Sequence, residues 1–130
     1  RDIVLYPYAG QRDIWPAFYN ESPVPLPGYK VSGFPVSVQF NPALYKKVKL
    51  SSFRLYDEHG KEVQETNILQ QKNDPNHLFT PYEFALMPLK RLEFNTTYTV
   101  HFEAVADGQK VEKHWVFRTT KPKETLYRIT

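Results

Sequence analysis

Four side chains that could bind a divalent metal ion fall on one predicted β-hairpin, residues 92–120. Two runs of alternating apolar and polar residues are joined there by Asp107-Gly108, a dipeptide typical of a two-residue hairpin turn. Counting back from that turn places two histidines opposite each other and two glutamates opposite each other, on one face. Imidazole nitrogens and carboxylate oxygens are ligands that zinc accepts in proteins. The four residues are His101, opposite His114, and Glu103, opposite Glu112.

The same four residues are also ordinary on a solvated sheet face, where protonated histidine partly offsets facing glutamates. This second interpretation is the one we favour, so the sequence predicts neither a bound metal nor another cofactor. We choose this register because it brings large apolar residues together on the opposite face of the hairpin, where Val100 faces Trp115 and Tyr98 faces Phe117. A register one residue away would place Val100 opposite His114 and scatter the buried set, so we reject it.

A tyrosine motif precedes the first arm of this hairpin. Leu92, Thr96 and Tyr98 have the spacing L-x-x-x-T-x-Y. This spacing resembles the tyrosine corner of immunoglobulin-like and fibronectin type III sandwiches, in which the phenol bonds to nearby backbone. We therefore expect the Tyr98 hydroxyl to contact the backbone of residues 92–95.

Further β-strands are predicted along the rest of the chain, with no convincing helix. An edge strand starts the chain, because Pro7 fits an edge better than a sheet centre. In the strand at 48–57 the apolar parity breaks, which predicts a bulge near Ser51 and Ser52. The fold class is an all-β, two-sheet antiparallel sandwich of seven to eight strands, forming one domain over residues 1–130. The expected strands are 3–8, 34–40, 48–57, 63–69, 82–89 and the two hairpin arms. The expected core is Val36, Val38, Phe40, Phe53, Leu55, Phe84, Leu86, Val100, Trp115 and Phe117.

Composition narrows the class of protein. The chain has no cysteine, which excludes disulfides and thiol chemistry, and no apolar run long enough for a membrane helix. The net charge of +3 comes from scattered basic residues, and the one dense cluster, Lys46, Lys47 and Lys49, fits a solvated edge strand. We therefore expect no nucleic-acid binding. Because the chain begins with Arg1 and leads directly into a strand, we interpret it as a domain excised from a larger exported protein.

Several segments resemble known secreted modules. The opening at residues 6–14 and the closing W-V-F-R-T run are similar to bacterial Ig-like domains. More narrowly, four segments resemble the carboxy-terminal accessory domain of bacterial CAP-domain proteins, which are secreted proteins of the cysteine-rich secretory type. The resemblance implies a bacterial, periplasmic or extracellular accessory domain. None of the histidine and glutamate motifs of the CAP domain itself is present, so its activity is not carried over. The four segments are GFPVSVQF (33–40), DPNHLFT (74–80), EFALMPL (83–89) and NTTY (95–98).

Other kinds of chemistry have weaker signals. No serine lies in a G-x-S-x-G elbow, and we expect no enzyme activity. Asp57, Asp74 and Asn76 could supply oxygens to calcium, but no calcium-loop motif contains them. Asn20 and Asn95 each begin a glycosylation sequon, and Glu93 gives the second one the longer bacterial form.

Aromatic residues near the amino end raise the possibility of sugar binding. Exposed rings of Trp15, Tyr19 and Tyr29 could form a stacking platform, whereas the alternative is that Trp15 and Phe18 pin a long loop onto the sandwich. Two coplanar exposed rings would favour the platform. The leading hypothesis is a non-catalytic spacer or protein-interaction module at the cell envelope, with a protein partner. A carbohydrate-binding module and a purely structural domain that stabilises its neighbour are the alternatives.

Overall fold

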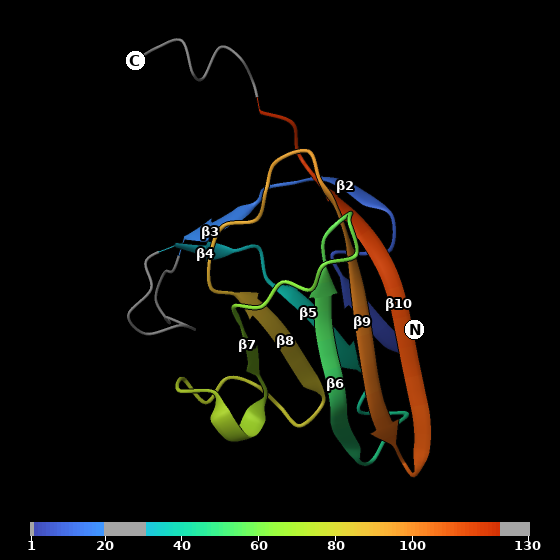
Figure 1. Cartoon of the computed structure of the whole chain (residues 1–130). Helices are drawn as coiled ribbons and strands as arrows, with labels where there is room; N and C mark the ends of the chain where they lie inside the picture. Colours follow the sequence, from blue (N-terminus) through green and yellow to red (C-terminus); the bar gives the residue numbers. More distant parts are fainter. Residues whose placement is uncertain (1, 20–30, 123–130) are drawn as a thin grey trace.

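The computed structural model describes residues 2–19 and 31–122 and shows a sandwich of two four-stranded sheets (Figure 1). Sheet I has the order β1-β5-β8-β7, and sheet II has the order β2-β10-β9-β6. Sheet I contains β1 (Ile3–Tyr6), β5 (Val36–Phe40), β8 (Glu83–Pro88) and β7 (Thr66–Leu69). Sheet II contains β2 (Gln11–Ile14), β10 (Gln109–Thr119), β9 (Thr97–Ala106) and β6 (Val48–Tyr56). The all-β, two-sheet fold class is therefore confirmed.

The core lies between the two sheets and is built from the alternating apolar residues of both. All ten predicted core residues are buried and belong to one cluster. Phe102 packs edge-on against Phe53 at 5.1 Å between ring centroids and contacts Phe40 and Phe84 of sheet I at 6.0 Å each. Offset and edge-to-face ring pairs of this kind add to the stabilisation that apolar burial provides. Phe102 therefore joins the two sheets.

The β9–β10 hairpin has the predicted register. Asp107 and Gly108 form the turn with positive φ angles of 50° and 82°, as a type I′ turn requires. Trp115 lies opposite Val100, and Phe117 lies opposite Tyr98. The Asp107 carboxylate also accepts hydrogen bonds from the backbone N–H groups of residues 46 and 47, so the turn anchors the chain that enters β6.

Two smaller predictions are also confirmed. The Tyr98 hydroxyl accepts a hydrogen bond of 2.8 Å from the backbone N–H of Glu93, which is the expected tyrosine corner. The pairing of β6 with β9 shifts register between Leu50 and Ser52, where the parity of the apolar residues predicted a bulge.

Some elements were not predicted. Strand β2 pairs in parallel with β10, so sheet II contains one parallel pair. A two-stranded ribbon of β3 (Ala17–Tyr19) and β4 (Val31–Gly33) was missed, as was a 3₁₀ turn η1 (Gln71–Asn73) in the segment expected to be a loop. Asn20 and Tyr29 lie outside the described residues, as do the side chains of Phe18 and Tyr19.

Candidate functional site

The outer face of sheet I carries a shallow groove of about 310 Å³ that we call the Gln39 groove. On β5, the core takes Val36, Val38 and Phe40, so Ser37 and Gln39 point to the opposite side. The exposed side chain of Leu78 borders the groove from a neighbouring loop. The groove is lined by Ser37, Val38, Gln39, Leu78, Phe79, Glu83 and Phe84.

Exposed apolar side chains continue this surface toward β1. Val4 pairs with Gln39 and Tyr6 pairs with Ser37, so both lie on the outer face, and each is 45% exposed. The Tyr6 ring contacts Phe34 at 5.6 Å. A second depression of about 250 Å³ is lined by Val4 and Gln39, among others, so the two hollows adjoin at Gln39. The result is an open surface with few charges, on which exposed apolar side chains lie beside the polar side chains of Ser37 and Gln39.

The loop that borders the groove is held by a buried carboxylate. Asp74 accepts backbone N–H hydrogen bonds from Asn76, Leu78 and Phe79. Burial alone would raise the pKa of Asp74, but these hydrogen bonds to the ionised form outweigh it, and the pKa is lowered from 3.8. The Asp74 carboxylate therefore accepts hydrogen bonds from the loop backbone, and these bonds fix the position of the exposed Leu78.

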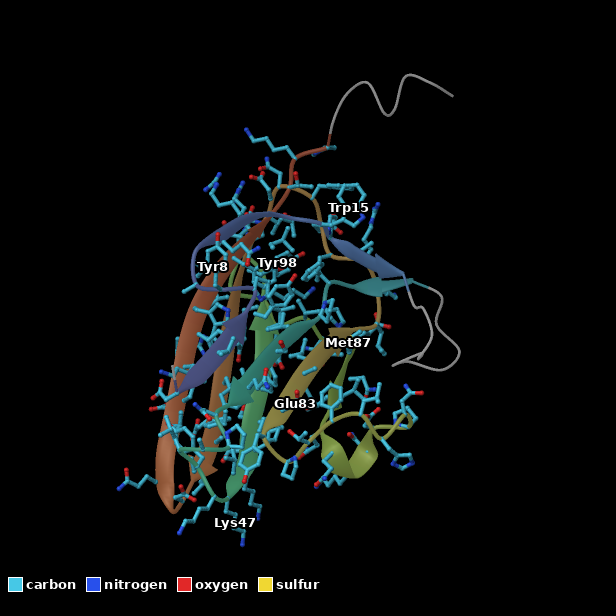
Figure 2. The ribbon with its side chains drawn as sticks, turned by 180° about the vertical axis from the view of Figure 1, so that it is seen from behind. Tyr8, Trp15, Lys47, Glu83, Met87 and Tyr98 are labelled. Carbon is cyan, nitrogen blue, oxygen red and sulfur yellow. The ribbon has the colours of Figure 1, made fainter. Side chains whose placement is uncertain are left out.

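A second apolar cluster attaches the same loop to sheet I. Leu69, Ala85 and Met87 point away from the main core and pack with Phe79 and Leu89. In Figure 2, Glu83 and Met87 lie on β8 in the sheet nearer the viewer. The loop therefore covers the β7–β8 half of the outer face, and the β1–β5 half stays open.

The outer face of sheet II carries the two histidines of the predicted hairpin. His101 lies opposite His114, and their ring centroids are 4.3 Å apart. Glu103 lies opposite Glu112, as predicted, but both carboxylates are within 3.8 Å of the Lys110 ammonium group. The structure thus brings all four residues together and assigns the glutamates a cationic partner that sequence reasoning missed.

The surroundings of His101 favour its neutral form. Tyr56 packs against it at 4.8 Å between ring centroids. Desolvation, and then the charge of His114, lower the pKa of His101 below 6.5. Among the described residues, no group of three or more histidine, aspartate or glutamate side chains is arranged to hold a metal ion.

The described aromatic rings near Trp15 do not form the flat platform on which a sugar could stack. Trp15 is 46% exposed and meets Phe94 edge-on, with an angle of 84° between the rings. The Arg91 guanidinium lies over the Phe94 ring, 5.3 Å from its centroid. Trp15 and Phe94 are therefore not the coplanar pair that sugar stacking would favour.

The remaining candidate residues take structural positions. Asp57 accepts backbone hydrogen bonds from His59 and Lys61 within a turn. The exposed Asn95 has a positive φ of 51°, and its side-chain oxygen accepts a hydrogen bond from Arg118. Glycosylation of Asn95 stays a prediction. No helix among the described residues is long and apolar enough to span a membrane.

The two packed sheets and the tyrosine corner define an immunoglobulin-like β-sandwich. The sequence matches no protein-family model and no curated protein. The structure is similar to that of CopC from Methylosinus trichosporium OB3b, with a TM-score of 0.57 and 20% sequence identity. The similarity covers 95% of this chain and 96% of that chain. At this identity, the likeness shows the fold alone.

Sequence reasoning missed the Gln39 groove because its residues come from three separate segments. Leu78 was the available signal, since it is an apolar residue between the polar stretch 70–77 and the next strand. A single exposed leucine in a loop indicates an interaction surface only when the residues that lie beside it in the fold are known.

Proposed function

We propose that this chain is a non-catalytic accessory module of a secreted or cell-envelope bacterial protein, and that it binds a protein partner through the Gln39 groove. The observation that carries the proposal is the set of exposed apolar side chains, Val4, Tyr6 and Leu78, on the face that contains this groove. Exposed apolar side chains that gather on one face beside polar groups are typical of protein interaction sites.

The resemblance to CAP-protein accessory domains supports the same surface. All seven residues that line the groove lie in three of the segments that carry the resemblance, 33–40, 74–80 and 83–89. The Asp74 hydrogen bonds hold the Leu78 backbone in one position, which lowers the entropy lost when a partner binds. We infer that the module is attached to a CAP-type protein and contacts its partner by this face.

The groove is better suited to a protein than to a small molecule. It is open to solvent, and few of its side chains are charged. The carboxylate of Glu83 accepts a hydrogen bond from the backbone of Thr80, so part of its hydrogen-bonding capacity serves the loop. Small-molecule sites, in contrast, usually enclose most of the ligand surface.

Site-specific photo-crosslinking tests the proposal. A photoreactive amino acid at Gln39 is expected to yield a discrete cross-linked protein from the cell envelope of the source organism. The Leu78→Asp variant should lose that product, because a charge at the groove border opposes apolar docking. The matched control places the same photoreactive group at Val105, which is 39% exposed on sheet II, and should give no such product.

The other hypotheses give different results in the same series. Equal cross-linking from both positions, or a product that persists in Leu78→Asp, would contradict docking at the groove. Absence of a cross-link together with binding on a glycan array would identify a carbohydrate-binding module. Absence of both would leave the purely structural role, in which the domain only stabilises its neighbour.

A further inference from the structure

The His101–His114 pair has features of a metal chelate, independently of the Gln39 groove. In a two-residue hairpin the residues next to the turn form a hydrogen-bonded pair, and the pairs alternate from there. Counting from Ala106 and Gln109 makes His101 and His114 a pair without mutual backbone hydrogen bonds, the kind in which side chains come closest. The 4.3 Å between their ring centroids agrees with this.

We propose that these two imidazoles form a bidentate site for a divalent transition-metal ion, with water molecules completing its coordination. The pair lies in a surface hollow of about 240 Å³ that also includes Tyr56 and Glu112. The two histidines are directly opposite on paired strands, so the backbone already holds them side by side before an ion binds. Neutral imidazole is the form that ligates metals, and each ring of the pair offers one nitrogen to a shared ion.

The charges around the pair set how strong the site can be. Glu112 lies 4.0 Å from Nε2 of His114 and would favour a cation there. Lys110 lies between the two glutamates and opposes a cation. Arg54, opposite His101 on β6, is held by Glu62 at 3.2 Å, which offsets its charge. We therefore expect a site of moderate affinity rather than a closed structural zinc centre, which needs four protein ligands.

The two imidazole donors also predict the order in which different metal ions should bind. Imidazole nitrogen suits copper, nickel and zinc, and divalent affinities rise from nickel to copper and fall again at zinc. Cu²⁺ should bind most tightly to the pair, followed by Ni²⁺ or Zn²⁺. The expected stoichiometry is one ion per chain.

NMR titration of the folded chain with Zn²⁺ alone, and separately with Cu²⁺ alone, tests the proposal. Zn²⁺ should shift the imidazole signals of His101 and His114 in parallel. Substoichiometric Cu²⁺ should broaden the same signals together with the ring of Tyr56. His101→Ala and His114→Ala should each lower Cu²⁺ affinity by at least the roughly 10–100-fold that loss of a supporting outer-shell group costs.

Two further variants separate a specific site from general histidine binding. The His59→Ala/His77→Ala double variant removes two exposed histidines elsewhere and should leave the affinity unchanged. Lys110→Ala should raise the affinity several-fold, because removal of its charge leaves two carboxylates beside the ion. All of these side chains are on the surface, and a thermal melt of each variant will establish that it is folded. Unshifted His101 and His114 signals at millimolar Zn²⁺, or an equal loss of Cu²⁺ affinity in the double variant, would overturn the proposal.

Discussion

The indole Nε1 of Trp115 donates a hydrogen bond of 2.8 Å to the carbonyl oxygen of Pro7, 108 positions earlier in the chain. Trp115 belongs to sheet II, and Pro7 directly follows β1 of sheet I. The backbone N–H of Gly10 then bonds to the carbonyl of Val116. These contacts guide the chain from one sheet to the other, so Trp115 acts both as a core residue and as a polar anchor.

Truncation of Trp115 should be severe. Trp115→Ala is expected to lower the free energy of unfolding by about 3–5 kcal/mol, the usual cost of removing a buried aromatic side chain. Trp115→Phe keeps most of the apolar volume but leaves the buried Pro7 carbonyl without its donor, which costs about 1–3 kcal/mol. Urea denaturation measures both. An alanine variant that loses less than about 1 kcal/mol would show that Trp115 does not support the core.

The tyrosine corner makes a separate prediction. Tyr98→Phe removes the acceptor of the Glu93 N–H and should cost about 1–3 kcal/mol, since that donor is left unsatisfied in a partly buried turn. Tyr8→Phe is the matched control, because Tyr8 is 62% exposed and should tolerate loss of its hydroxyl. Equal stability of the two variants in urea would contradict a structural role for the corner.

The Asp74 loop should loosen in acid. The pKa of Asp74 is lowered in the folded chain, so its ionised form stabilises the loop fully above the ordinary value of 3.8. That contribution is lost as the pH falls below 3.8 and through the lower folded-state pKa. Hydrogen exchange at the Leu78 and Phe79 amides, which donate to this carboxylate, should accelerate over that range relative to core amides.

The matched variant for this loop is Asp74→Asn, which keeps the shape but has only one acceptor oxygen. Its Leu78 and Phe79 amides should be weakly protected at neutral pH and should show no further acid loosening. Retention of wild-type protection in Asp74→Asn would mean that other contacts hold the loop.

Gly33 should not tolerate a side chain. A Cβ atom at this position would lie 2.5 Å from Cβ of Pro88 and 2.7 Å from the carbonyl oxygen of Lys90, both closer than atoms can approach. Gly33→Ala should therefore displace β4 from β8 and cost about 1–3 kcal/mol through overpacking. Ser37→Ala, at a half-buried position on the next strand, is the control and should unfold close to wild type. A Gly33→Ala chain with unchanged stability would show that β4 moves freely.

Local sequence patterns could predict the elements whose partner is the next element in the chain. The register of β9 and β10 followed from the turn at Asp107-Gly108 and from alternation around Val100 and Trp115, because a short turn fixes which residues face each other. The tyrosine corner could also be predicted from local sequence, because Tyr98 and Glu93 lie only five residues apart. The pairing of His101 with His114 was a consequence of that register.

Only the tertiary structure decided the contacts between distant segments. Strand β2 has the sequence QRDI, which shows no apolar alternation. This segment is a strand because its backbone pairs with the free edge of β10. The Asp74-Pro75 sequence is typical of a turn, but it does not indicate that the carboxylate would be buried and would also bond to the amides of Leu78 and Phe79. The Gln39 groove likewise needs β5, β8 and a loop to meet. Periodicity encodes which side of a strand is buried, whereas the choice of partner depends on packing against segments far away in the chain.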